Sequence, residues 1–490
     1  MSTVDFPIFA NSFADELPDM FEPWSAVVVE NPTLLVVNNE LAHELGFDPQ
    51  WLRGVDGVRF LVGNHPLPAM TPIAQAYAGH QFGGFSPRLG DGRALLLGDI
   101  VDTNGVRRDV HLKGSGRTRF SRGGDGKAAV GPMLREYVIG EAMNALGVPT
   151  TRALGVVATN ELIPRDEMLP GAVLCRVALS HLRVGSFQYA ATMSHDHVRR
   201  LADHSIARHY PELASSNDRY LDFFRAVMNK QARLIAQWMT IGFIHGVMNT
   251  DNMTISGETI DYGPCAFMDT YGPTTVFSSI DHQGRYAYGN QPHIAQWNLA
   301  RLVETLLPLI RDDKDESIRV ATEAINEFPA IFEREWERLM RAKLGLTERS
   351  SIETSLFHSL LTLFESHRID YTNGMRALSD VVRGRRERMH SLFDMPVAFD
   401  AWARPWLNAV SSDGRDAHEI ADAMDAINPA YIPRNHLVET ALAAATRGDL
   451  SSLDSLMEVL LDPFHEREGL EQFTRPMPSD WDGYQTFCGT

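Results

Sequence analysis

The pattern of apolar residues changes near residue 186, and this change constrains the fold more than any other feature of the sequence. Before it, one helix is predicted at 134–146, and short apolar segments predict strands at 94–100, 108–113, 152–158 and 172–178. After it, residues 188–244 predict helices with apolar side chains three or four residues apart, and helices dominate to the end. Strands followed by helices predict an α+β protein with two lobes and a cleft between them.

The 490 residues exceed the length at which a single core stops growing, so we expect two or more domains. Residues 1–75 are mixed, with short strands predicted at 27–29 and 34–37 and a helix at about 38–45. Residues 77–91 are too rich in glycine for a helix and predict a structured loop.

The overall charge and the few cysteines exclude several classes of protein. A net charge of -18 makes the chain a poor binder of nucleic acids or anionic membranes. It has no apolar run of membrane-spanning length, no signal peptide pattern at its start, and only three cysteines, too few for a disulfide framework. We therefore expect a cytoplasmic monomer with no nucleic-acid or membrane partner.

Positive charge nevertheless gathers in residues 103–135, which hold only Asp109 and Asp125 against Arg107, Arg108, Lys113, Arg117, Arg119, Arg122, Lys127 and Arg135. Within this stretch, residues 114–127 contain five glycines and four basic residues. Backbone N–H groups and basic side chains in such a segment can surround a phosphate. A disordered, solvated surface loop is the alternative.

Lys113 and Glu136 form the first candidate pair. Lys113 ends a predicted strand, and Glu136 lies early on the predicted helix, 23 residues later. A strand lysine paired with a helix carboxylate is the ion pair that holds ATP in kinases. Taken alone, Lys113 is more often a surface lysine, and Glu136 is more often a first-turn charge that complements the helix dipole.

Residues 245–252 read His-Gly-Val-Met-Asn-Thr-Asp-Asn. Kinases of small molecules carry His-Gly-Asp-x-x-x-x-Asn, and His245, Gly246 and Asn252 match that spacing. Val247, however, stands where the catalytic aspartate is expected.

Asp261-Tyr-Gly follows nine residues after Asn252 and is similar to the metal-binding Asp-Phe-Gly turn of kinases. Ile255 and Ile260 flank a Ser-Gly turn, which predicts a small hairpin that presents Asn252 and Asp261 to the same side. Two hard oxygen ligands together with triphosphate oxygens suit Mg²⁺ or Mn²⁺. Lysine, helix glutamate, loop asparagine and Asp-Tyr-Gly in this order predict a protein-kinase-like fold.

At this point the sequence resembles the selenoprotein O family of pseudokinases. The resemblance rests on Tyr-Ala-Gly-His-Gln-Phe-Gly at 77–83, Lys-Gly-Ser-Gly at 113–116, the motif at 245–252 and Asp-Tyr-Gly-Pro-Cys at 261–265, and it runs over essentially the whole chain. It implies a kinase fold that binds ATP with reversed phosphates and transfers AMP to Ser, Thr or Tyr of target proteins.

The resemblance also implies four parts of the chain. Residues 1–75 would be an N-terminal extension that packs on the kinase core, and residues 76–185 the strand-rich N-lobe. Residues 186–400 would be the helical C-lobe with the catalytic and metal-binding loops. Residues 401–490 would be a helical C-terminal extension that ends in a cysteine-containing tail.

The residues that would carry this activity follow by position. Asp251 would be the proton acceptor in place of the base missing at Val247, and Asn252 and Asp261 would hold the metal. Lys113 and Glu136 would form the ion pair beside the phosphates. The other nucleotide-binding residues would be Gly90, Gly92, Arg93, Asp125, Gly126, Arg176 and Arg183. Without the resemblance, the last two arginines would be assigned to surface or interlobe salt bridges.

The cysteines have a separate interpretation. Family members use a disulfide near the C-terminus, which implies a regulatory bond between Cys265 and Cys488, although free buried cysteines are the common case. Many relatives carry selenocysteine where this chain has Cys488, so selenium chemistry does not transfer. Cys175 is expected in the core.

Two other activities remain open from the residues. The chain could be a metal-dependent kinase of proteins or small molecules with Asp251 as base, but Val247 argues against it. It could also be a catalytically silent ATP-binding scaffold, but a complete metal pair at Asn252 and Asp261 argues against that.

Overall fold

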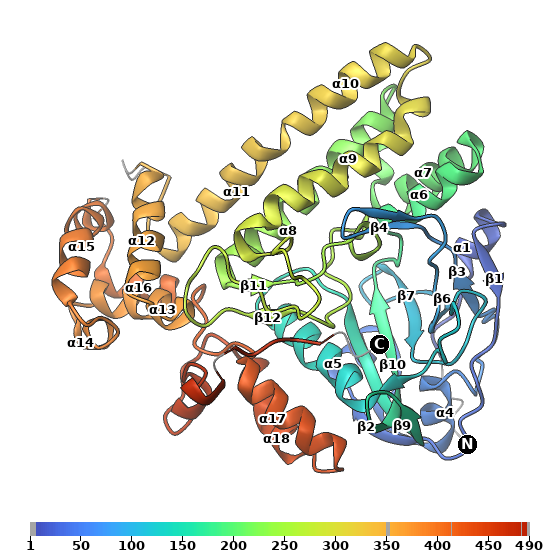
Figure 1. Cartoon of the computed structure of the whole chain (residues 1–490), viewed down its shortest axis with the longest axis horizontal. Coiled ribbons are helices and arrows are strands. Elements are labelled where there is room, and N and C mark those ends of the chain that lie inside the picture. Colours follow the sequence, from blue (N-terminus) through green and yellow to red (C-terminus); the bar gives the residue numbers. More distant parts are fainter. Residues whose placement is uncertain (1–5, 349–352, 413, 482, 488–490) are drawn as a thin grey trace.

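The computed structural model describes residues 6–348, 353–412, 414–481 and 483–487, and it shows an α+β protein (Figure 1). The predicted class is therefore confirmed at this level. Among the described residues, the main sheet is antiparallel throughout and has the order β1–β3–β6–β7–β10–β9–β2, with β8 paired to β10. Its strands are β1 (Phe21–Pro23), β2 (Thr33–Val37), β3 (Ile73–Gln75), β6 (Ala94–Val101), β7 (Arg107–Lys113), β8 (Ala128–Ala129), β9 (Arg152–Pro164) and β10 (Met168–Ala178).

The two faces of the sheet are covered by different helices because strand side chains alternate between faces. One face, with Val110, Leu112 and Cys175, packs against α2 (Asn39–Glu44), α3 (Pro49–Arg53) and α4 (Val55–Leu61). Cys175 is fully buried there, as expected for a core residue. The other face packs against α5 (Val130–Ala145) and carries Lys113 at the end of its central strand.

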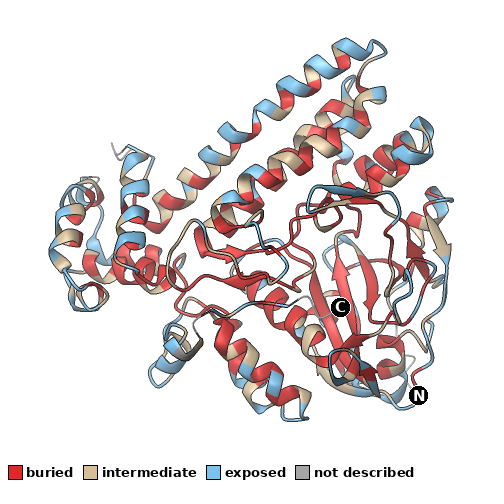
Figure 2. Cartoon of the chain, viewed as in Figure 1, coloured by how far each residue is buried: buried red, intermediate tan, exposed pale blue. Residues whose placement is uncertain are grey.

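The helical half follows the sheet in the chain and surrounds α8, whose end is set by Gly242 in the left-handed conformation. Figure 2 shows these helices with buried residues facing inward and exposed residues facing outward. The helices are α6 (Val184–Met193), α7 (His195–His209), α8 (Arg219–Ile241), α9 (Gln291–Ile310), α10 (Lys314–Asn326), α11 (Phe328–Lys343), α12 (Ser355–Ser366), α13 (Tyr371–Val382), α14 (Glu387–His390), α15 (Pro396–Ser411), α16 (Ala417–Asp425), α17 (Asn435–Thr446) and α18 (Ser451–Leu460).

The helices of the C-terminal end contact the sheet-bearing half. α17 and α18 pack on α5 (Figure 1). The guanidinium of Arg434, just before α17, is fully buried and donates to the carboxylates of Asp269 and Asp370. This buried ion cluster fastens the C-terminal helices to the loop after β12 (Ala266–Phe267), which pairs with β11 (Phe243–Ile244).

Most predicted elements are confirmed, and β9 and β10 are longer than expected. The strand predicted at 27–29 is wrong, because its backbone is held by the Asn64 side chain and by Ser115 rather than by a neighbouring strand. The predicted loop at 77–91 contains a hairpin of β4 (Gly79–Gln81) and β5 (Gly84–Ser86). Within the described part of the chain, no helix has the length and apolar character needed to cross a bilayer.

Helix α5 begins four residues earlier than predicted, at Val130. Glu136 therefore lies in the second turn, too far from the helix N-terminus to act as a first-turn charge. Pro132 is accommodated because the first turn needs no intrahelical N–H donor at that position.

Candidate active site

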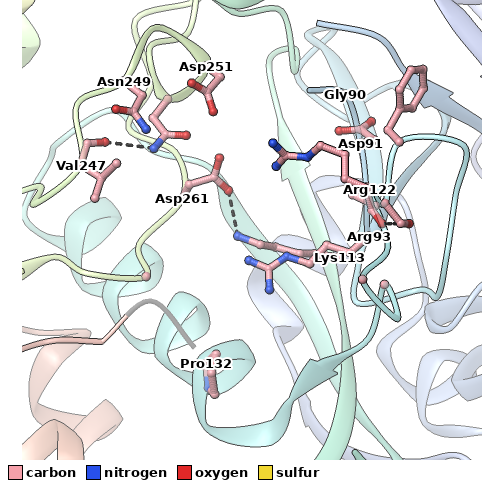
Figure 3. A pocket seen from close by; sticks show the side chains of 18 of the residues that line it. Gly90, Asp91, Arg93, Lys113, Arg122, Pro132, Val247, Asn249, Asp251 and Asp261 are labelled. Carbon is pink, nitrogen blue, oxygen red and sulfur yellow. Dashed lines mark hydrogen bonds and ion pairs between the residues drawn. The ribbon is translucent and has the colours of Figure 1, made fainter. Parts of the chain in front are cut away.

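A cavity of about 500 Å³ lies between the α5 face of the sheet and the loop that follows α8 (Figure 3). Seven basic and five acidic side chains line it, which makes it more cationic than the acidic protein as a whole. All the residues predicted from the sequence to bind nucleotide or metal or to act in catalysis line this one cavity: Gly90, Gly92, Arg93, Lys113, Asp125, Gly126, Glu136, Arg176, Arg183, Asp251, Asn252 and Asp261.

The sheet places Lys113 and Arg176 on the same face. Arg176 on β10 lies opposite His111 on β7, and Lys113 is two residues further along β7. The Lys113 ammonium forms an ion pair with the Glu136 carboxylate of α5, and Arg176 lies 3.7 Å from the same carboxylate. The two cations and Glu136 are buried, so their charges act across a poorly screened site.

The Asp261 carboxylate forms ion pairs with three cationic side chains. Its Oδ1 accepts from Lys113 at 2.8 Å and from Arg176 at 2.7 Å, and its Oδ2 accepts from Arg183 at 2.8 Å. Figure 3 shows the Asp261 carboxylate directed toward Lys113. Burial raises the pKa of Asp261, but the attraction of the three cations is stronger in total and holds that pKa well below its usual range. The backbone of Asp261 has a φ of 63°, an uncommon value for a residue with a side chain.

The loop from His245 to Asn252 is held in place by contacts with the segment 260–264. The His245 ring bonds to the Ile260 carbonyl through Nε2 at 2.9 Å, and a side chain at Gly246 would meet the Pro264 carbonyl oxygen at 2.3 Å. Asn252 donates its amide N–H to the Val247 carbonyl at 3.0 Å, which leaves its own carbonyl oxygen as the possible metal ligand. The Val247 side chain at the cavity wall can neither accept nor donate a proton.

Asp251 supplies the carboxylate of this loop and has few partners. Its Oδ2 accepts from Gln81 at 3.2 Å, while its buried Oδ1 has no hydrogen-bond partner among the described residues. Burial raises the pKa of Asp251 to about 6, against a smaller lowering by Arg183. A carboxyl group with such a pKa is suited to accept a proton near neutral pH.

The glycine-rich segments form the opposite wall. Gly90 has a φ of 75°, and a side chain there would strike the Phe120 ring. Gly126 has a φ of 70°, and a Cβ there would come within 2.2 Å of the Gly116 backbone. Asp125 accepts from Arg165 at 2.8 Å, and this ion pair, with the hydrogen bond from the Lys127 backbone N–H, lowers the Asp125 pKa.

The predicted hairpin at 255–260 does not form. Its two sides bridge to other segments, with Thr254 paired to Arg183 and Thr259 paired to Thr150. The turn between them is closed by the Thr254 hydroxyl, which donates to the Glu258 carbonyl and accepts from the Glu258 N–H. Asn252 and Asp261 still reach the same cavity, because each flank is fixed to the sheet-bearing half.

Sequence reasoning missed several residues of the site. Tyr77 lies under the Arg183 guanidinium at 4.7 Å, and Asp91 approaches the His111 ring at 3.3 Å. Arg122 lines the cavity and belongs to the basic segment, so the composition of that segment could have indicated it as a site residue. Arg165 gave no signal, because the β9–β10 connection that carries it is distant in sequence from every motif.

Cys265 lies behind the site rather than in the cavity. Its thiol is fully buried and donates to the Tyr262 carbonyl at 3.2 Å, and burial raises the Cys265 pKa to about 12. Cys488 lies outside the described residues, so the Cys265–Cys488 bond stays a prediction.

No group of three or more His, Cys, Asp or Glu in the described part of the chain could hold a metal ion by itself. A divalent ion would need oxygens from another source, and phosphate groups supply such oxygens.

The α+β fold therefore holds a cavity with buried cations on one side and a carboxyl group of raised pKa on the other, an arrangement typical of enzymes that act on phosphate-bearing ligands. The family model described as "Protein adenylyltransferase SelO" matches residues 8–461, and the chain belongs to this family.

Curated relatives cover nearly the full length of the chain. The "Protein nucleotidyltransferase YdiU" of Mycobacterium sp. (strain KMS) is 58% identical over 480 residues, which is 98% of each chain. Proteins of the same name in Mycolicibacterium paratuberculosis and Cereibacter sphaeroides (strain KD131) are 57% and 54% identical, over 98% of this chain and 97% and 99% of their own.

Proposed function

We propose that this protein transfers AMP from ATP to the hydroxyl groups of Ser, Thr or Tyr in target proteins. The family and its named relatives support a protein nucleotidyltransferase. The observation that carries the proposal is the convergence of Lys113, Arg176 and Arg183 on Asp261 at the inner end of the cavity. These cations form a ready site for the terminal phosphates of ATP.

The position of the cations favours ATP bound with its phosphates reversed relative to a kinase. Two guanidinium groups and an ammonium group would draw the β- and γ-phosphates inward, and the α-phosphorus would then face the loop of Asp251. The glycine-rich wall, with Gly126 closely packed on Gly116, would lie along the nucleotide. Val247 cannot accept a proton, so an acceptor hydroxyl that approached an inward γ-phosphate would find no base at this position.

The donor set fits a hard divalent cation. Asn252 offers a carbonyl oxygen and Asp261 a carboxylate whose lowered pKa keeps it ionised, and both reach the cavity. We propose Mg²⁺ or Mn²⁺ held by these two residues and by phosphate oxygens. When bound, the ion would neutralise charge on the pyrophosphate leaving group.

The chemical step is a displacement at the α-phosphorus. The acceptor oxygen forms a new P–O bond, the bond between the α-phosphorus and its bridging oxygen to the β-phosphate breaks, and pyrophosphate leaves. The proton of the acceptor hydroxyl passes to the Asp251 carboxylate. Lys113, Arg176 and Arg183 stabilise the charge that grows on the pyrophosphate, which is where preorganised cations contribute most to rate.

We further propose that the two halves are the lobes of a protein-kinase-like fold. Support comes from the Lys113–Glu136 ion pair between the central strand and α5, and from the metal-binding pair on the loops after α8. The proposed parts are residues 1–75, 76–185, 186–400 and 401–490. Residues 1–75 supply β1 and β2, the strands at the two ends of the sheet order. This part would therefore complete the N-lobe rather than extend away from it.

Two parallel labelling reactions test the function. Purified protein is incubated with Mg²⁺ and casein as a generic acceptor, once with ATP labelled on the α-phosphorus and once with ATP labelled on the γ-phosphorus. Protein-bound label from the α-position alone is the expected result. Label from the γ-position alone would identify an ordinary kinase, and the roles of Arg176 and Arg183 would have to be reassigned.

Asp261→Ala is the variant that separates catalysis from simple nucleotide binding. It removes the metal ligand, and the expected loss of α-label transfer is about 10²–10³-fold or more. Full activity of Asp261→Ala would refute the site assignment, and an inactive wild-type protein that still binds ATP would favour the scaffold alternative.

A further inference from the structure

The tip of the β4–β5 hairpin carries a bulky residue where turn geometry disfavours one. The two turn residues, Phe82 and Gly83, both have positive φ, at 50° and 85°. A two-residue hairpin turn of this kind favours Asn or Asp followed by Gly. A phenylalanine in the left-handed region is strained, and such strain persists where the side chain serves a function.

The Phe82 ring packs against the Tyr286 ring, with centroids 5.1 Å apart, but it is not fully buried. It is 40% exposed and lines the cavity, and Ile280, which is 45% exposed, lines the same cavity from the segment between β12 and α9. Phe85, on the neighbouring strand, is 47% exposed but does not line the cavity. Exposed apolar side chains that line a charged cavity, as Phe82 and Ile280 do, are typical of a binding surface.

The hairpin is tied to the proposed catalytic loop at three successive residues. The His80 N–H donates to the Thr250 hydroxyl at 2.6 Å, and the Gln81 side chain donates to Asp251 Oδ2 at 3.2 Å. The Phe82 N–H donates to the Asn249 side chain at 3.1 Å. The hairpin tip that carries Phe82 is therefore held beside the loop of Asp251, so a chain segment that delivers a hydroxyl to Asp251 would approach close to this tip.

A positive charge lies next to the tip of the β4–β5 hairpin. The Arg285 guanidinium stacks on Trp297 at 4.9 Å and lies 3.8 Å from the position that a Cβ on Gly83 would take. No carboxylate in the described part of the chain forms a salt bridge with Arg285, although the protein carries a net charge of -18. An acidic group on a partner would supply the missing counter-charge.

We propose that Phe82 and Ile280 bind an apolar side chain beside the acceptor hydroxyl, and that Arg285 binds a carboxylate of the same acceptor segment. The inference rests on the proposed function and names its substrate class: protein segments in which Ser, Thr or Tyr has an apolar neighbour and an acidic residue close by. Phe82 is a specificity-determining residue that contacts the acceptor protein and not the nucleotide.

The test uses synthetic peptide libraries with a central Ser, Thr or Tyr in which each flanking position is varied in turn. The full-length wild type and Phe82→Asn are compared by α-label transfer. Asparagine suits positive φ, so this variant is expected to fold at least as stably as the wild type. Ala69→Asn is the matched control, since Ala69 also has positive φ, at 65°, but does not line the cavity.

In the wild type we expect enrichment of apolar residues at one flanking position and of Asp or Glu at another. Phe82→Asn should lose the apolar preference, and its kcat/KM for the preferred peptide should fall about 10-fold or more, as for other lost apolar contacts. Arg285→Gln should lose only the acidic preference. Affinity for ATP, measured by calorimetry in the absence of acceptor, should stay unchanged in both variants and in Ala69→Asn.

Three outcomes would overturn the inference. They are an unselective wild type, a Phe82→Asn variant with the wild-type preference, and a Phe82→Asn variant with weakened ATP affinity, which would place the ring against the nucleotide. Failure of the proposed function looks different, because the wild type would then transfer no α-label to any peptide.

Discussion

Replacing Asp251 by asparagine should stabilise the protein while it stops the reaction. The folded-state pKa of Asp251 is about 6, against 3.8 for an ordinary aspartate, because the carboxyl group is buried. The folded protein therefore holds this proton more tightly than the unfolded chain does. Its ionisation costs stability progressively as the pH rises from about 4 to about 6, and the full cost persists above that range.

The size of the effect follows from the shift. A difference of about two pKa units corresponds to about 3 kcal/mol at pH 8, and the same linkage gives roughly 1.5 kcal/mol at pH 5 and about 0.5 kcal/mol at pH 4. Asparagine keeps the shape and carries no charge, so Asp251→Asn should recover much of this cost. A gain of this size should raise Tm at pH 8 by about 2–5 °C in a chain of this length.

The assay is thermal unfolding of wild type and Asp251→Asn at several pH values from 4 to 8, with α-label transfer measured on the same samples. The difference in Tm should grow with pH up to about 6 and then level off, while transfer by the variant stays low throughout. A variant that is less stable than the wild type by the same amount at every pH would refute the reasoning. It would mean that Asp251 makes a structural contact that asparagine cannot replace.

Three other predictions concern the pH dependence of Asp251, the Gly126 turn and the buried Arg434. The rate of AMP transfer by the wild type should rise between pH 5 and 7 with an apparent pKa of about 6, since only ionised Asp251 accepts a proton, and a rate that falls over this range would contradict that role. Gly126→Ala should raise the KM for ATP by about 10-fold or more, because its Cβ would strike the Gly116 backbone and displace the loop, whereas Gly123→Ala, with a φ of 96° but open space around it, should change the KM little. Arg434→Met should destabilise the fold by about 3–5 kcal/mol, since it leaves two buried carboxylates unpaired; thermal unfolding should show a much smaller change for Arg319→Met, whose ion pairs are exposed.

The sequence predicts best where one local pattern decides the structure. The short apolar segments and the segments with a period of 3.6 residues predicted the strands of the sheet and the helices after it, because burial of apolar side chains decides both patterns. The valines at 27–29 failed the same reasoning, since their β-propensity is satisfied by no partner strand, and the Asn64 side chain takes their hydrogen bonds instead.

Some residues of the candidate site could likewise be predicted from local sequence patterns, and others could not. Lys113, Glu136, Asn252 and Asp261 stand in recognisable motifs, and the structure brings them to one cavity. Arg165 could not have been found, because only the fold of the β9–β10 hairpin carries it to Asp125. The unpartnered Oδ1 of Asp251 was equally hidden, since burial and the loss of partners are properties of packing rather than of sequence.

The arrangement around Asp261 predicts that nucleotide binding and metal binding are coupled by electrostatics. The Asp261 carboxylate contacts Lys113, Arg176 and Arg183, and Glu136 shares the first two of these cations. Two carboxylates facing three cations leave the cluster with a net positive charge. A triphosphate carries more negative charge than a carboxylate and would attract the three cations toward itself. The Asp261 carboxylate, relieved of them, would then regain its attraction for a divalent ion, and each phosphate oxygen would add to that attraction. We therefore expect the same three cations to hold the inner phosphates and to weaken metal binding by Asp261 until the phosphates are present.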